Sequence, residues 1–338
     1  MALRLIEVVI PESGKNAIEQ LLDSDTVMHF WQEESSVQPD RFLLKVLMDA
    51  THTEQFLDKA EQLLGRYEEF RLIILTVDAT LPRIEEPEKE EKEEKESLEP
   101  WEEPLKGLRV SREELYTEIS GGIQLTRIYM AMVILSTIVA ALGILRDNTA
   151  VVIGAMVIAP LLAPNVGLAL STTLGDFQLG LKSLKSNLSG FAVALLISVF
   201  VGFFMTVDET VYQIANRTEV HLTDISLALA SGAAGVLAYT VGMSAAVIGV
   251  MVAVALLPPL VTAGLLLGDM QWELSFFAFL LLMTNVICVN LAAVATFILQ
   301  GVRPRTWYET KTAKRANKIA LAIWISLMLV LAVIIYFS

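Results

Sequence analysis

Few residues in this 338-residue chain have the types and spacing that catalysis requires. The three histidines, His29, His52 and His221, lie far apart, and the single cysteine is Cys288. This composition excludes an internal disulfide and a thiolate metal cluster. The apolar segments offer only Cys288, serine and threonine as nucleophiles, with no histidine or carboxylate nearby, so an active site within them is not expected. We therefore expect no enzyme, no metal and no cofactor.

Prolines and amides inside apolar segments are the more informative residues. The candidates are Pro160, Pro164, Asn165 and Thr172, then Pro258, Pro259 and Thr262, and finally Asn285 and Asn290. Each proline lacks a backbone donor and so frees a carbonyl inside an apolar segment. Such segments can hold a solute by helix dipoles, amides and carbonyls, and helix N-termini after Pro164 and Pro259 favour a small anion. The alternative is that the prolines are only packed kinks and the amides only tie helices together.

The two proline-containing segments are copies of one another. Residues 150–164 and 245–259 are identical at nine of fifteen positions without a gap, whereas apolar composition alone gives about two or three matches. Both copies continue to a Gly-Asp pair, which ends at Asp176 and at Asp269. We interpret these aspartates as interfacial caps, with gates as the alternative. The repeat indicates an internal duplication.

Apolar segments long enough to cross a hydrocarbon core of roughly 30 Å dominate the chain from residue 128 onward. Hydrophobic residues make up 54% of the chain, above the roughly 45–50% of a soluble domain. No segment has Asp, Glu, Lys or Arg in its interior, which argues against a large soluble helical bundle. About seven spans are predicted, at residues 128–145, 150–171, 188–206, 225–241, 245–267, 275–299 and 319–337.

The duplicated segment is the second of three spans in each half of the predicted bundle. Because three is an odd number, the second copy must enter the membrane from the opposite side. The fold expected is therefore an α-helical polytopic membrane bundle with an inverted 3+3 repeat plus one further span. The two sets of prolines then predict two helix breaks, at 159–165 and at 254–260, buried in protein or lining a wet cavity.

The formal charge of the protein lies in its first third. Residues 1–110 hold 26 Asp and Glu against 13 Lys and Arg, and so carry the whole net charge of −13. An acidic domain repels phosphates, which argues against nucleic acid as a partner. Strand-like and helix-like runs in residues 1–80 follow the order βαββαβ of a soluble ferredoxin-like α+β domain, which often binds a small ligand.

Composition and loop charge divide and orient the chain. The predicted parts are a cytoplasmic domain at 1–80, an acidic linker at 81–110, a connecting helix at 111–127 opened by a capping box, membrane repeat 1 at 128–206, membrane repeat 2 at 207–300, and a basic loop with the final span at 301–338. Loops 172–187, 242–244 and 300–318 carry eight basic residues, whereas the opposite loops carry two, Arg146 and Arg217. The positive-inside rule then predicts a cytoplasmic N-terminus and an external C-terminus.

The acidic head, the charged linker and the paired motifs at 152–164 and 247–259 resemble the uncharacterised hydrophobic-domain family of prokaryotic integral membrane proteins, a domain-of-unknown-function family. The similarity covers roughly residues 110–300. It implies a bacterial or archaeal inner-membrane protein, and it supplies no substrate and no binding residues.

The pattern as a whole favours a membrane transporter or channel for a small solute, with a slight preference for an anion. The solute path would run between the two predicted breaks, and the cytoplasmic domain would regulate it by binding a ligand. Small-residue helix faces also predict a homo-oligomer in the lipid bilayer. The alternative is a membrane-anchored sensor or scaffold, in which the spans only hold the soluble domain at the membrane.

Overall fold

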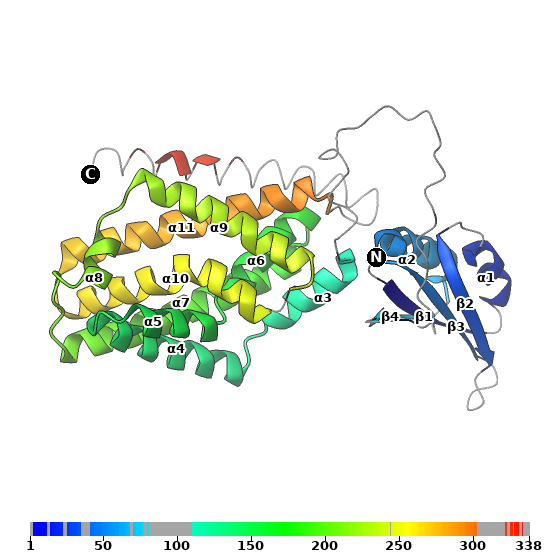
Figure 1. The fold of residues 1–338 in the computed structure, drawn as a ribbon, viewed down its shortest axis with the longest axis horizontal. Helices are drawn as coiled ribbons and strands as arrows, with labels where there is room; N and C mark the ends of the chain where they lie inside the picture. The colour runs from blue at the N-terminus through cyan, green and yellow to red at the C-terminus, as the bar shows by residue number, and fades with distance from the viewer. Residues whose placement is uncertain are drawn as a thin grey trace. The chain divides into compact units, whose positions relative to one another are not determined.

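The chain divides into two compact units, Met1–Glu114 and Leu115–Ser338 (Figure 1). The computed structural model describes residues 3–11, 14–22, 26–34, 41–67, 70–77, 80, 110–243 and 245–302, with seven positions between 322 and 333. The predicted acidic linker at 81–110, apart from its last residue, lies outside the described residues. So does most of the predicted basic loop and final span at 301–338.

The first unit contains a four-stranded sheet with the predicted βαββαβ order. The elements are β1 (Leu3–Pro11), α1 (Lys15–Leu22), β2 (Val27–Glu34), β3 (Arg41–Asp49), α2 (Ala50–Leu64) and β4 (Arg71–Val77). The strand order in the sheet is β2-β3-β1-β4, and every neighbouring pair is antiparallel. This is the connectivity of a split βαβ, ferredoxin-like sandwich.

Alternating apolar side chains bind the sheet of this unit to its two helices. Successive residues of a strand point to opposite faces, so one face is apolar along β3 and along β1 from Ile6 to Ile10. The helices place an apolar stripe on that face. The buried cluster consists of Ile6, Val8 and Ile10 from β1, Leu44, Val46 and Met48 from β3, Ile18 and Leu21 from α1, and Phe56, Leu57, Ala60 and Leu64 from α2.

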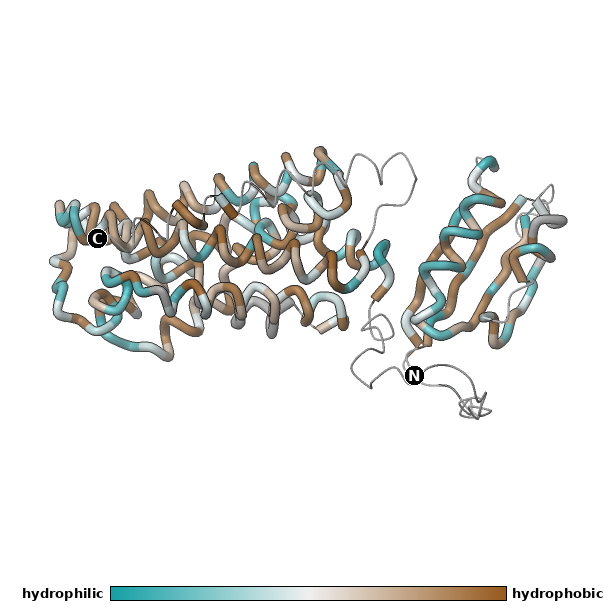
Figure 2. The backbone as a smooth tube through the Cα atoms, turned by 90° about the horizontal axis from the view of Figure 1, so that it is seen from above, coloured by the Kyte–Doolittle hydropathy of each residue, from teal (hydrophilic) through white to brown (hydrophobic). Residues whose placement is uncertain are grey.

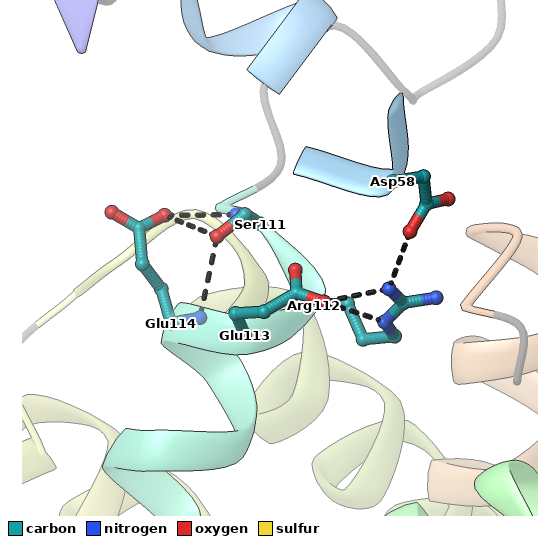
Figure 3. Close-up of polar contacts among 5 residues, drawn as sticks. All are labelled: Asp58, Ser111, Arg112, Glu113 and Glu114. Atoms are coloured by element: carbon teal, nitrogen blue, oxygen red, sulfur yellow. Dashed lines mark hydrogen bonds and ion pairs between the residues drawn. The ribbon is translucent and has the colours of Figure 1, made fainter. Parts of the chain in front are cut away.

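The predicted capping box is present where the helix α3 (Arg112–Gly122) begins (Figure 3). The Ser111 hydroxyl accepts a hydrogen bond from the Glu114 backbone at 3.2 Å, and the Glu114 carboxylate accepts one from the Ser111 backbone at 2.9 Å. Arg112 donates to Asp58 of α2 at 3.0 Å. Burial lowers the pKa of Arg112, but hydrogen bonds with Glu113 and Asp58 outweigh it and raise that pKa. These contacts join Arg112 to α2 within the first unit, which ends at Glu114.

The second unit is helical, and hydrophobic residues run along the length of its helices (Figure 2). After α3 it contains α4 (Arg127–Leu145), α5 (Thr149–Ile158), α6 (Leu162–Leu174), α7 (Phe177–Phe204), α8 (Tyr212–Thr218), α9 (Leu222–Thr240), α10 (Ala245–Gly268) and α11 (Trp272–Leu299). Helix α11 contacts α6, α9 and α10, while α10 also contacts α5 and α7. Among the most apolar windows of α4, α7 and α11, that of α11 has the largest buried share, 72%. Helix α11 is therefore the most enclosed of these three.

Several helices are suited to cross a membrane. Three of those described, α4, α7 and α11, are long and apolar enough, and the number rises to five if the bent pairs α5–α6 and α8–α9 each count as one span. Helix α10 has 24 residues, about 36 Å in length. Six of the seven predicted apolar segments coincide with helices, and the last, at 319–337, lies largely outside the described residues.

Two predicted connections differ in the structure. The connecting helix predicted at 111–127 is shorter, because α3 ends at Gly122 and the Thr126 side chain caps a new helix, α4. Residues 172–187, predicted as a loop, form the end of α6, a left-handed Gly175 (φ 73°) and the first turns of α7. Helix α7 is therefore 28 residues long, about 42 Å, and longer than the hydrocarbon core.

Glycines bring α7 and α10 into close contact. A Cβ atom added to Gly202 of α7 would overlap the Leu265 backbone, and one added to Gly268 would overlap the Val199 backbone. Gly264 lies one turn before Gly268 in a Gly-x-x-x-Gly spacing and faces Ser198. Without a hydrophobic driving force in lipid, such backbone contact is a main source of helix association.

We expect Gly202→Ala to lower the free energy of unfolding by about 1–3 kcal/mol, because the added methyl group must push α7 away from α10. The measurement is denaturant unfolding of the full chain in a fixed detergent. Gly154→Ala is the matched control, since a Cβ there has no neighbour within 4 Å. Equal losses in the two variants would contradict the close contact.

Candidate functional site

The first copy of the repeated segment contains a helix break. Helix α5 ends at Ile158 and α6 begins at Leu162, with a bend of 52° between them. Ala159 is extended, with ψ 120°, as expected for a residue that precedes a proline. Pro164 lies in the first turn of α6, where a missing N–H costs little. The interruption predicted within 159–165 is therefore present.

The second copy has no break, and the prediction of one at 254–260 is wrong. Helix α10 continues through Pro258 and Pro259. In the alignment of the two copies Pro160 corresponds to Ala255, so the second copy lacks the proline at which the first is interrupted. Pro259 cannot donate to the Ala255 carbonyl, and Asn285 of α11 donates to that oxygen at 2.7 Å instead. A side chain from a neighbouring helix thus replaces the lost backbone bond.

A buried pair of amides joins the two halves of the bundle. Asn290 of α11 donates to the Asn165 side-chain oxygen at 3.1 Å, across 125 residues of chain. The Asn165 amide donates to the Leu161 carbonyl at 2.9 Å, next to the break. The two side chains are 1% and 0% exposed. This amide pair, Asn165 with Asn290, is a point at which the interrupted helix contacts α11.

Several buried polar atoms near these helices have no hydrogen-bond partner among the described residues. They are the Asn290 side-chain oxygen, the Thr262 hydroxyl, and, on α7, the Ser183 hydroxyl and the Asn187 side-chain oxygen. An unpaired polar atom in a buried site costs about 1–3 kcal/mol. Sequence reasoning missed Ser183 and Asn187 because it assigned residues 172–187 to a loop. Their spacing of four residues, one helical turn, is the signal that could have found them.

The other predicted residues make local contacts. Thr172 donates to the Leu168 carbonyl of its own helix at 2.9 Å. Asp176 is the N-cap of α7, where it accepts two backbone hydrogen bonds, and it also accepts one from Tyr116 at 2.9 Å. Asp269 accepts from the Val207 backbone at 3.3 Å and so joins two turns. These contacts give Asp176 a capping role and Asp269 a bracing role. Thr172 lies apart from the amide pair.

No group of three or more His, Cys, Asp or Glu side chains that could hold a metal ion occurs in the part of the chain that the structure describes. The polar groups gathered between the spans are amides, hydroxyls and backbone carbonyls. Such groups can bind a small solute or water by hydrogen bonds, without supplying a charge of their own.

The family model for a domain of unknown function, DUF389, matches residues 156–291. An uncharacterized protein of Methanocaldococcus jannaschii is 34% identical over 339 residues and covers 100% of both chains. The chain belongs to the DUF389 family. No solved structure matches it. The DUF389 region includes the break, the amide pair and every predicted path residue, from Pro160 to Asn290, so the family match falls on the candidate site.

We expect Asn285→Leu to lower the free energy of unfolding by about 1–2 kcal/mol, because it leaves the Ala255 carbonyl unpaired. In a Pro259→Ala background residue 259 regains a backbone N–H that reaches the same carbonyl. The same substitution should then cost less, with an interaction energy above about 0.5 kcal/mol in a double-mutant cycle measured by denaturant unfolding.

Thr284→Val is the control for this cycle, because Thr284 is equally buried on α11 but donates to the Leu280 carbonyl of its own helix. Its cost should be the same with either residue at position 259. If Asn285→Leu also costs the same in both backgrounds, Asn285 does not compensate for Pro259.

Proposed function

We propose that this DUF389 protein is a membrane transporter or channel for a small solute, with its path along the contact between α6 and α11. The observation that carries the proposal is the buried amide pair at the interrupted helix. Polar side chains inside a membrane bundle are costly, and they commonly mark the path of a solute. Here they coincide with irregular backbone, which lipid does not tolerate unless protein or a wet cavity surrounds it.

Element lengths support the duplication on which this proposal depends. Helices α4 and α9 each have 19 residues and begin at 127 and 222, while α7 and α11 each have 28 residues and begin at 177 and 272. All these starts differ by 95 residues, as do the repeated segments that begin at 150 and 245. We infer that α4 to α7 and α9 to α11 are two copies of a three-span unit.

Contacts at one end of the bundle support the inversion of the two copies. Gln213 of α8, just before α9, donates from its backbone to Asp147, which follows α4. The end of α4 and the approach to α9 therefore lie together. Val207, after α7, likewise contacts Asp269, after α10. Corresponding helices then run in opposite directions, as in many transporters that alternate between two faces.

The chemistry of the path favours a neutral or anionic solute. Leu161, the N-cap of α6, makes no side-chain cap, so the positive end of this helix dipole lies at the break. The unpaired oxygen of Asn290 is an acceptor for a hydroxyl or amide donor of the solute. Both amides are buried, which corresponds to a closed conformation of the path.

The proposal also covers the oligomeric state, the membrane and the orientation of the protein. It is not an enzyme and has no cofactor, it resides as a homo-oligomer in a prokaryotic inner membrane, and its N-terminus lies in the cytoplasm and its C-terminus outside. The acidic first unit binds a cytoplasmic ligand. The supports are the apolar helices and the loop charges.

The test is flux of small anions and neutral metabolites into vesicles that contain the purified full chain. Asn165→Ala and Asn290→Ala should each lower the flux at least about tenfold, and the double variant should be no worse than either, because the two residues form one contact. Ser136→Ala is the control, since Ser136 is equally buried but donates only to Val133 of its own helix.

The proposal fails if no solute moves, or if the amide variants transport like the wild type. A bundle that serves only as an anchor for a sensor or scaffold would also leave the first unit functional when it is joined to an unrelated membrane helix. That result, together with no flux, would establish the alternative.

A further inference from the structure

A pocket of about 500 Å³, with both polar and apolar lining, lies beside the first turns of α7. Its lining combines Tyr116 and Ser120 of α3 with Gln124 of the following loop, and with Lys182 and Lys185 of α7. Leu125 and Leu179 add an apolar wall. The volume is in the range of small-molecule sites in proteins.

The two lysines of this pocket carry positive charge that no carboxylate in the described part of the chain pairs with. They lie three residues apart on α7, so they share one face of the helix. Neither forms an ion pair or a side-chain hydrogen bond within the described residues, and both are exposed. Asp176, the N-cap of the same helix, already accepts hydrogen bonds from Tyr116 and from the backbone of Gln178. Two adjacent cations without a carboxylate partner are a site for an anion.

Hydrogen bonds fix the loop after α3 against α7, and so fix two walls of the pocket. The Ser186 hydroxyl donates to the Ile123 carbonyl, and Tyr129 of α4 donates to the Ser186 carbonyl at 3.1 Å. Both serine groups are thereby engaged, and the loop that carries Gln124 is fixed against α7. The polar side chains of the pocket therefore come from three elements, α3, the loop after it and α7, and not from the surface of one helix.

The position of the pocket along α7 points to the lipid headgroup layer. Helix α7 exceeds the hydrocarbon thickness by about 12 Å, and its lysines lie within its first three turns. Exposed apolar side chains lie on the same helix, including Leu184 between the lysines and Leu188 after them. At the positions 95 residues later, α11 carries Phe277 and Leu280 in place of the lysines, so the basic pair belongs to one end of the bundle.

We propose that this pocket binds a phosphate-bearing anion, with Lys182 and Lys185 as its charged ligands and Tyr116, Ser120 and Gln124 as its polar wall. The source that the position favours is the headgroup of an anionic phospholipid, whose acyl chains would lie along the exposed leucines of α7. Basic pockets between spans at the headgroup level recognise such lipids by the same chemistry.

The test measures binding of phosphatidylglycerol and phosphatidylcholine to the full chain in detergent by native mass spectrometry. The wild type should retain phosphatidylglycerol in preference, and Lys182→Gln with Lys185→Gln should weaken that binding about thirtyfold. The double Lys→Arg variant keeps the charge and should bind as the wild type does. Arg146→Gln removes a cation between α4 and α5, away from the pocket, and should have no effect.

A second arm separates the two sources of phosphate. Inorganic phosphate is titrated into lipid-free protein by calorimetry. Binding that depends on the two lysines would assign the site to a soluble phosphate, whereas binding of phosphatidylglycerol alone would assign it to lipid.

Equal retention of both lipids by the wild type would overturn the proposal. So would unchanged binding in the double Lys→Gln variant, provided that its thermal unfolding in phosphatidylcholine matches that of the wild type. No flux is measured, so this result is independent of transport.

Discussion

Backbone N–H and C=O groups that are shielded from water must form hydrogen bonds within the protein, and this requirement governs how the helices of this molecule are built. The two copies of its proline-rich segment meet that need in different ways. The first copy ends one helix before Pro160 and starts another, so the prolines fall where helices have no internal bonds. The second copy keeps one helix and has the Ala255 carbonyl paired with Asn285. Two segments of similar sequence thus form a break in one half of the bundle and a continuous helix in the other.

The polar side chains of the spans follow from the same constraint. Hydroxyls such as those of Ser136, Thr284 and Thr296 donate to carbonyls one turn earlier, which satisfies them within a single helix. The amides are satisfied only in part in this way, because Asn165 and Asn290 each donate to a carbonyl one turn earlier but have a further donor and an acceptor to pair. They therefore reach to neighbouring helices, and these contacts link α11 with both α6 and α10.

Sequence patterns predicted much of this fold, for identifiable reasons. Strand alternation located the first sheet, and uncharged apolar runs located α4, α9, α10 and α11 to within a few residues of their ends. The beginning of α7 was missed because Lys182 and Lys185 are typical of a loop, although a helix longer than the hydrocarbon core carries such residues at its ends. Asn165 and Asn290 were both named, but that they meet could not be read from residues 125 apart. The sequence also could not show that Asn285 donates to the Ala255 carbonyl, which Pro259 leaves without a donor on another helix.

The hydrogen bond between Asn165 and Asn290 joins residues that are 125 positions apart, and this separation sets an order of assembly. The chain emerges from its N-terminus, so α6 is made well before α11. Until α11 arrives, the Asn165 oxygen lacks the donor that it has in the finished protein. The first three spans consequently cannot complete their interior by themselves. A chain that ended before residue 290 would therefore lack the donor that pairs with the Asn165 oxygen between α6 and α11.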